Sequence, residues 1–433
     1  MKELALRIFR NALAAVDVRC AFERKLQHDD GTSELGLQGV NLHAYREILG
    51  VAFGKAAFAM AEGLAELLAP DFRPRGIISC PSVPPRVLAG WDVFVAGHPV
   101  PNAASFESAR AILELLKPAN EDSLIFFLLS GGGSSLVELP LDPAISLGDF
   151  QELHRILVTC GAPIEEINAI RKHLSAVKGG RLALAATLAT KITLGITDVP
   201  EGHESALASG PTLPDPTTVS DVDRIVRQYA LAERFPASIR RSIESRSLPE
   251  TPKPGDPAFD RAHFILLLGM HDLFHCTHQV AEAEGFLCIC DNSTDNWPID
   301  RAAEYLLGQL EVLRRENPGR CVAVIADGEV SSPVTGNGIG GRNSAFVLAC
   351  VQKIAGKNIA VLSAGTDGVD GNSRAAGAVA DGETFARAQA KGLDPADYFR
   401  RSDAFSFFET LGDSIHTGPT GNNLRDLRLF LAW

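Results

Sequence analysis

The sequence has no Cys-x-x-Cys pair, although eight cysteines are scattered along its 433 residues. Their spacing argues against a disulfide framework or a zinc ribbon and favours reduced thiols in a cytoplasmic protein. The chain also lacks any apolar run that approaches the ~18 residues of a membrane span. Residues 1–26 read as an amphipathic helix and not as a signal peptide. We therefore expect a cytoplasmic protein that does not contact a membrane.

Cationic residues are in the minority, with 41 Lys and Arg against 53 Asp and Glu, which gives a formal net charge of -12. This balance argues against a broad basic surface for nucleic acid. A phosphate site in such a protein needs local basic residues or a divalent cation. With 45% hydrophobic and 22% charged residues, the chain is typical of a soluble globular enzyme and is long enough for two sizeable cores.

Short apolar segments that predict strands alternate with segments that have the periodicity of helices. This rhythm predicts α/β architecture, with parallel sheets covered by helices on both faces. Residues 248–257 hold four prolines among polar residues and predict a linker, after which the rhythm restarts. We therefore expect two α/β domains, residues 1–247 and residues 258–433.

A glycine-rich loop follows the strongest predicted strand, residues 124–129. It reads Ser-Gly-Gly-Gly-Ser-Ser and comprises Ser130, Gly131, Gly132, Gly133, Ser134 and Ser135. Glycine lets the backbone approach a ligand closely, and consecutive N–H groups form an anion-binding concavity. Open α/β sheets bind ligands at the carboxyl ends of strands. The loop therefore predicts a phosphate site, with a flexible glycine turn as the alternative.

Lys55 follows Gly54 at a predicted junction between a strand and a helix. Helix N-termini attract anions, and a lysine there adds a mobile positive charge. The segment is not a Walker A loop, because three residues separate Gly50 from Gly54 and Ala56 follows the lysine. A surface lysine at a helix start is the alternative.

Residues 167–181 predict a basic helix. On it, Asn168, Arg171, Ser175 and Lys178 recur at three- and four-residue spacing, which places them on one face. Cations concentrated on one helix of an acidic protein indicate an anion site. A solvated helix face is the alternative.

Three acidic residues lie just beyond predicted strands. Asp198 is well placed to meet a metal ion or a hydroxyl proton, with a turn cap as the alternative. Asp367 and Asp370 lie in a glycine-rich loop and are candidate Mg²⁺ ligands.

Arg342 opens a predicted helix, where its fork suits a phosphate or a carboxylate. It is preceded by Gly336, Gly338 and Gly341, which match the pattern G-x-G-x-x-G. This match predicts a dinucleotide site only weakly, because the glycines do not directly follow a strand.

Taken in order, segments along nearly the whole chain resemble the class II glycerate kinases, the glycerate 2-kinase family that carries the MOFRL domain. The resemblance is carried by Phe53–Ala56, Gly97–Pro99, Ser130–Ser134, Ile167–Ser175, Lys178–Leu182, Thr197–Val199, Ala208–Thr212, Gly340–Asn343, Thr366–Gly371 and Thr417–Gly421.

The resemblance implies a Rossmann-like, parallel-sheet N-terminal domain and a mixed-sheet, MOFRL-like C-terminal domain, with the active site in the cleft between them. It also implies that the N-terminal segment, up to about residue 40, packs on the other domain. The implied reaction transfers the γ-phosphoryl group of ATP to the 2-hydroxyl of D-glycerate, with Mg²⁺ or another divalent cation. The implied partners are therefore a small-molecule acid and a nucleotide. A homodimer is an open alternative to a monomer.

The resemblance locates the active site residue by residue. It implies that the active-site groups of the family fall on Lys55, Asp198, Glu329, Arg342, Asp367 and Asn423. From these and from the physics of phosphoryl transfer we predict the individual roles. We expect catalytic roles for Lys55, Asp198 and Arg342; phosphate contacts from Ser130, Gly131, Gly132, Gly133, Ser134, Ser135, Lys178, Ser209 and Gly210; substrate contacts from Lys55, Asn168, Arg171, Arg342 and Asn423; and metal ligation by Glu329, Asp367 and Asp370.

Four positions depart from the family pattern. Asn102 stands where the family has Asp, Asp327 stands within a segment that the family writes Ser-Gly-Gly-Glu, and His203 and His271 replace other residues. Three alternatives to glycerate phosphorylation therefore stay open. They are a kinase for a related sugar acid, a hydroxypyruvate reductase, which is how part of the family is labelled, and a sugar-acid sensor that has lost catalysis.

Overall fold

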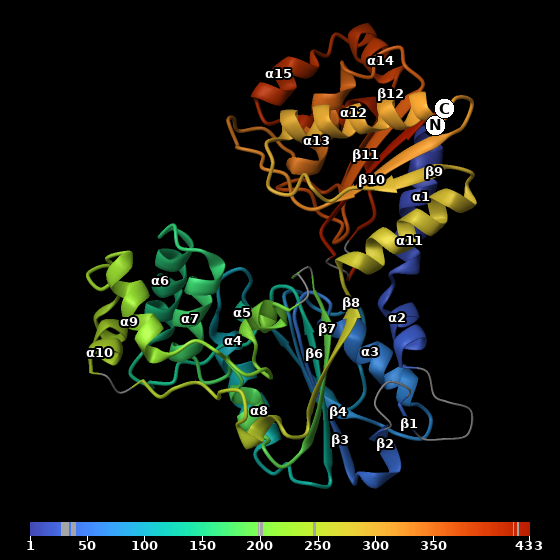
Figure 1. Ribbon diagram of the computed structural model, residues 1–433. Helices are drawn as coiled ribbons and strands as arrows, with labels where there is room; N and C mark the ends of the chain where they lie inside the picture. Colours follow the sequence, from blue (N-terminus) through green and yellow to red (C-terminus); the bar gives the residue numbers. More distant parts are fainter. Residues whose placement is uncertain are drawn as a thin grey trace. The chain divides into compact units, whose positions relative to one another are not determined.

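The computed structural model describes residues 1–26, 34–35, 40–197, 199, 202–245, 248–418, 420–421 and 424–433. It contains two compact units, residues 21–267 and residues 1–20 together with 268–433 (Figure 1). The first 20 residues thus join the C-terminal unit, where helix α1 (Lys2–Ala15) packs on helix α11 (Met270–Ala283). In the described part of the chain, every helix is too short or too polar to cross a membrane.

The unit of residues 21–267 is built on a six-stranded sheet in the order β5-β4-β3-β6-β7-β8. Its strands are β3 (Glu47–Phe53), β4 (Arg75–Cys80), β5 (Trp91–Val95), β6 (Ser123–Ser130), β7 (Thr190–Ile196) and β8 (Ala262–Leu268). The pairings from β5 through β7 are parallel. β6 is buried along its whole length, as a central strand covered on both faces must be. β8 lies in this sheet, although the predicted domain boundary at residue 258 placed it in the other domain.

Helices cover this sheet and also form a separate layer. α3 (Ala57–Leu68) packs on β3, β4 and β6, and α4 (Ala103–Leu116) packs on β4 and β5. Four further helices gather apart from the sheet (Figure 1) around a core of their own that includes Phe150, Leu153 and Ile170. They are α6 (Leu147–Val158), α7 (Ile164–Leu174), α9 (Val219–Gln228) and α10 (Ala237–Glu244). The short helices α5 (Gly133–Leu136) and α8 (Arg181–Ala185) follow glycine turns.

The C-terminal unit is built on a mixed sheet in the order β13-β12-β11-β14-β10-β9. Its strands are β9 (Leu287–Cys290), β10 (Val322–Asp327), β11 (Ile359–Gly365), β12 (Gly377–Asp381), β13 (Ser414–Ile415) and β14 (Asp426–Ala432). β14 runs antiparallel to both of its neighbours. Helices α12 (Ile299–Glu316) and α13 (Arg342–Val351) pack together on one part of the sheet, and α1 and α11 form a second pair. The predicted fold class, a parallel-sheet domain followed by a mixed-sheet α/β domain, is confirmed.

The structure differs from the sequence prediction in the basic segment. α7 ends at Leu174, so Ser175 and Lys178 do not continue the helical face of Asn168 and Arg171. Ser175 is extended, and it forms an isolated bridge with Pro140. A local helical period could not reveal this end, because the partner that holds Ser175 lies far away in the sequence.

Candidate functional site

The loops after β3 and β6 lie side by side, because these strands are parallel neighbours. The amide of Lys55 donates to the carbonyl oxygen of Gly131 at 2.9 Å. Gly54 makes this approach feasible: its φ is +132°, and a Cβ there would lie 2.1 Å from the hydroxyl oxygen of Ser130. The structure therefore brings Lys55 and the glycine loop together at the carboxyl edge of the sheet.

The glycine loop contacts a histidine to which the sequence assigned no role. Gly132 has a left-handed φ of +84°, and a Cβ there would lie 3.0 Å from the ring of His98. His98 Nδ1 lies 3.1 Å from Ser135 Oγ. Burial, and then repulsion by the charge of Lys55, lowers the pKa of His98, which favours the neutral imidazole. The Gly-His-Pro motif was the signal that could have marked this residue.

Part of the glycine loop is accessible and part is internal. Gly131, Gly132 and Ser134 are partly exposed. Ser130 and Ser135 are buried, and Ser130 Oγ accepts a hydrogen bond at 3.0 Å from the backbone amide that follows Lys55. The accessible amides and the Ser134 hydroxyl can meet an anion, whereas the buried serines hold the loop in place.

The turn at Ser209 and Gly210 contacts the glycine loop and supports it. Ser134 Oγ lies 2.9 Å from Ser209 Oγ, which donates to Asn168 Oδ1 at 3.3 Å. Ser209 has a φ of +61°, a conformation that costs a non-glycine residue about 1–3 kcal/mol. Ser209 is fully buried, and Gly210 is also buried. The structure thus places Ser209 and Gly210 under the loop, where they position Ser134 and Asn168 instead of lining a surface for phosphate.

Lys178 lies inside the unit, so its predicted contact with phosphate is corrected. Its ammonium is paired with the carboxylate of Glu138, and the two side chains are 1% and 0% exposed. Burial opposes the charge of Glu138, but Lys178 and His154 outweigh it and hold the pKa of that carboxyl below its usual range. Lys178 therefore neutralises a buried carboxylate and has no surface left for a ligand.

Arg171 differs from Lys178, because it remains half-buried on α7, one turn after Asn168. Burial lowers the pKa of Arg171, and the charge of Glu138 opposes that shift. In the described part of the chain, its Nε has no hydrogen-bond partner. This Nε is itself buried, so a substrate would have to meet the partly exposed remainder of the side chain, and the role of Arg171 in binding an anionic substrate stays a prediction.

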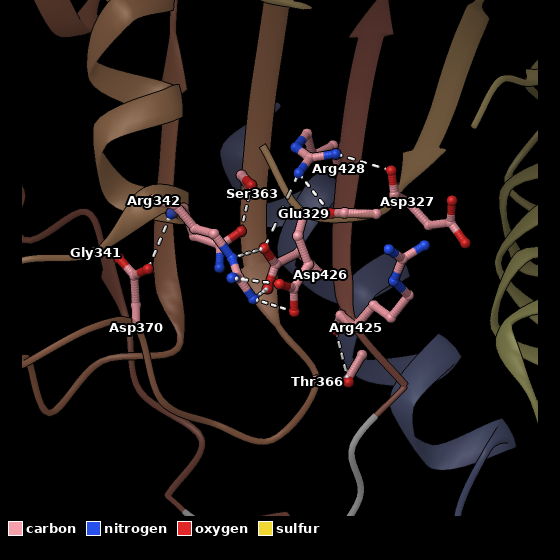
Figure 2. Close-up of polar contacts among 12 residues, drawn as sticks. Asp327, Glu329, Gly341, Arg342, Ser363, Thr366, Asp370, Arg425, Asp426 and Arg428 are labelled. Atoms are coloured by element: carbon pink, nitrogen blue, oxygen red, sulfur yellow. Dashed lines mark hydrogen bonds and ion pairs between the residues drawn. The ribbon is translucent and has the colours of Figure 1, made fainter. Parts of the chain in front are cut away.

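In the C-terminal unit, Arg342 is held between two carboxylates (Figure 2). It donates from Nη1 and Nη2 to both oxygens of Glu329, at 2.8 and 2.6 Å, and from Nε to Asp426 at 2.5 Å. The fold explains this meeting, because β10 ends and β14 begins at the same edge of the sheet. Burial disfavours the charged guanidinium, but Asp426 and then Glu329 outweigh it and raise the pKa of Arg342.

The segment that carries Glu329 is itself fixed by two charged residues, Arg428 and Asp295. Arg428, fully buried, donates to the carbonyl oxygens of Asp327 and Gly328 at 2.9 and 2.6 Å (Figure 2). The amide of Glu329 donates to Asp295 at 2.8 Å. Both carboxylate oxygens of Asp327 lack a hydrogen-bond partner among the described residues. Burial raises the pKa of Asp327 to about 6, against the opposing charges of Arg425 and Arg428.

The three carboxylates predicted to hold Mg²⁺ do not fit a metal centre. Glu329 accepts from Arg342, and Asp367 accepts from the amide of Val369 at 3.0 Å. Asp370 accepts from the amides of Asn343 and Ser344 at the start of α13, both at 2.9 Å. Across the described ranges, no group of three or more His, Cys, Asp and Glu side chains is arranged to hold a metal ion. The three carboxylates are therefore committed to other partners and do not form a metal-binding set.

Two further predicted site residues, Asp198 and Asn423, lie outside the described residues. Their roles stay predictions from the sequence.

The loop that matches G-x-G-x-x-G does not have the structure of a dinucleotide site. Gly336 comes nine residues after the end of β10 at Asp327, and not directly after a strand. The amides at the start of α13 that would meet a pyrophosphate already donate to Asp370. A carboxylate in that place repels phosphate.

Comparison with known proteins agrees with this architecture. Residues 4–244 match a domain of unknown function, DUF4147, and residues 322–426 match the MOFRL family. The chain is 34% identical to D-glycerate 2-kinase of Thermotoga maritima, over 99% of this chain and 97% of the relative. It is also 33% identical to an Agrobacterium vitis protein provisionally named hydroxypyruvate reductase, over 88% of this chain and 86% of the relative.

A solved structure matches the whole chain. The crystal structure of glycerate kinase from Thermotoga maritima superposes with a TM-score of 0.86 at 33% identity, covering 100% of this chain and 99% of that chain. The DUF4147 match alone spans more than half of the sequence, and the MOFRL match falls within the mixed-sheet unit. The chain therefore belongs to the glycerate 2-kinase family, in which a DUF4147 domain is followed by a MOFRL domain.

Proposed function

We propose that this protein is a kinase that transfers the γ-phosphoryl group of ATP to the 2-hydroxyl of D-glycerate. The full-length likeness to D-glycerate 2-kinase supports the reaction. The single structural observation that carries it is the backbone hydrogen bond that joins Lys55 to Gly131 in the glycine loop. The charge of Lys55 also acts on His98, which contacts Gly132 of the same loop. A cation beside backbone amides suits a transferring phosphoryl group.

In this reaction a bond forms between the 2-hydroxyl oxygen and the γ-phosphorus, and the bond from that phosphorus to the β,γ-bridging oxygen breaks. The hydroxyl proton leaves, and ADP departs. The amides of Gly131 and Gly132 and the hydroxyl of Ser134 would donate to phosphate oxygens, and Lys55 would offset their developing charge. Asp198 stays the predicted group for the hydroxyl proton. Magnesium would enter with the nucleotide, because Mg²⁺ binds readily to substrate phosphates.

The acceptor needs a second cation for its carboxylate. Arg171 and Arg342 are the candidates, because the first is a half-buried cation next to Asn168 on α7 and the second carries a carboxylate-binding fork that now holds Glu329. Asn168, next to Arg171 on α7, would accept from or donate to a substrate hydroxyl. A sugar acid related to glycerate stays an alternative acceptor for the same groups.

The experiment incubates purified protein with Mg-ATP and D-glycerate, and it measures ADP release and the position of the new phosphate by phosphorus NMR. A parallel reaction contains NADH and hydroxypyruvate. We expect ADP and 2-phosphoglycerate, without consumption of NADH. Consumption of NADH would favour the reductase, and inactivity in both reactions would favour a sensor. Lys55→Ala should lower kcat by about 10³–10⁵, which is the effect of an arginine finger on a migrating phosphoryl group.

A further inference from the structure

A cavity of about 890 Å³ lies wholly within the C-terminal unit, next to the start of α13. Its lining comes from the first residues of α12, the loop 331–335, the glycine segment 338–341 and the loop 367–372, with Phe399 and Ala404 on a further side. The predicted reaction groups in this lining are Arg342, Asp367 and Asp370. The rest of the cavity has no role in the mechanism above.

Large apolar side chains are exposed at this cavity. Val334 and Val369 line it and are 83% and 48% exposed, and Ile339, between two lining glycines, is 44% exposed. Among the described residues of this unit, Val312 is the other large apolar side chain with such exposure. Ile299, Val330 and Phe399 extend the apolar lining inward. Exposed apolar side chains that cluster around a cavity indicate a ligand-binding site, whereas single ones scattered on a surface do not.

The charges of the lining disfavour phosphate in the interior. Three lining residues are acidic, Asp300, Asp367 and Asp370, and one is cationic, Arg342. The N-terminus of α13, which would otherwise attract an anion, already donates to Asp370. An uncharged ligand part with hydroxyl donors suits these oxygens, whereas a triphosphate in the interior would meet three carboxylates.

The volume of the cavity also favours the nucleotide over glycerate as its ligand. A three-carbon acid fills a small part of 890 Å³, whereas cavities of ~300–1,000 Å³ hold ligands of the size of a nucleoside. Resting on the proposed kinase function, we propose that this cavity binds the nucleoside part of the phosphate donor. The base would lie among the apolar side chains, and the ribose hydroxyls would donate to acidic or amide oxygens of the loop 367–372.

The test fills the cavity at an exposed residue, so that the fold is not at risk. Val369→Trp is compared with Val312→Trp, an exposed valine of the same unit that does not line the cavity. Isothermal titration with ATP, without glycerate, measures donor binding independently of turnover. Steady-state kinetics then give the two KM values and kcat.

We expect Val369→Trp to weaken ATP binding and to raise the KM for ATP at least tenfold, with the KM for glycerate and kcat changed less than twofold. Val312→Trp should bind like the wild type. Unchanged ATP affinity in Val369→Trp, a rise confined to the KM for glycerate, or no nucleotide binding by the wild type would overturn the inference. If the wild type binds ATP without phosphorylating glycerate and Val369→Trp loses that binding, the result would support nucleoside binding in the cavity and would contradict glycerate as the acceptor.

Photolabelling gives a second readout that needs no variant. The wild type is irradiated with 8-azido-ATP and digested, and the labelled peptides are sequenced. Label within 331–345 or 367–404 supports the proposal, and label confined to residues 21–267 contradicts it.

Discussion

Glu329 occupies the whole bidentate face of the Arg342 guanidinium, at 2.6 and 2.8 Å, while Asp426 holds the Nε edge. The Glu329 side chain is 42% exposed and that of Asp426 is 3% exposed. Asp426 is therefore the fixed anchor and Glu329 the exchangeable partner. For Arg342 to meet a carboxylate or a phosphoryl group, Glu329 must give up its hydrogen bonds.

Arg342→Lys should lower kcat/KM by about 10³–10⁵ if the guanidinium contacts the migrating phosphoryl group, because lysine keeps the charge but cannot form the fork. Arg387→Lys is the matched control, since Arg387 also pairs with a carboxylate in this unit, Asp413. Steady-state kinetics of both variants decide the matter. Wild-type kcat/KM in Arg342→Lys would remove Arg342 from the reaction.

Gly132→Ala should abolish most activity, because the new Cβ would press against the His98 ring at 3.0 Å and shift the loop. Gly161→Ala is the control: its φ of +80° is almost the same, and nothing lies within 4 Å of its Cβ position. Both variants should lose about 1–2 kcal/mol of stability from the left-handed conformation. Equal loss of activity in both, measured at equal folded fraction, would contradict a role for the loop.

Lys178→Met should destabilise the protein by about 3–5 kcal/mol, because it leaves the buried charge of Glu138 without its ammonium partner. Adding Glu138→Gln should recover most of this loss, since the buried charge is then gone. Urea unfolding of both variants measures the effect. If Lys178→Met unfolded like the wild type but had a raised KM for ATP, Lys178 would be a phosphate ligand after all.

Asp327→Asn should change how stability depends on pH. The pKa of Asp327 rises from 3.8 to about 6 in the folded protein, so folding favours its protonated form. Its stabilising effect is fully present below pH 3.8 and is lost as the pH rises through 6, by roughly 2–3 kcal/mol. Between pH 5 and pH 7.5, the melting temperature of the variant should therefore rise relative to that of the wild type. A constant difference across that range would show that Asp327 stays charged.

Much of the N-terminal site could be predicted from local sequence. Parallel strands bring their carboxyl ends to one edge, so the glycine loop after β6 and Lys55 after β3 had to meet once both strands were recognised. The basic face around Asn168 was predicted in part, because a helical period says nothing about where α7 ends. The end at Leu174 depends on Ser175, whose hydroxyl donates to Glu138, 37 residues earlier.

The sequence by itself determined the α/β class, the order of most elements and the family, because strand and helix periods, glycine turns and motif spacing are local properties of the chain. The tertiary structure alone decided which charges reach a ligand. Lys178 forms an ion pair with Glu138, and Asp370 accepts hydrogen bonds from the amides at the start of α13. Arg342 forms ion pairs with both Glu329 and Asp426. The physical reason is that a buried or half-buried charge is neutralised by whichever opposite charge the fold brings near, and those partners lie 13 to 84 residues away.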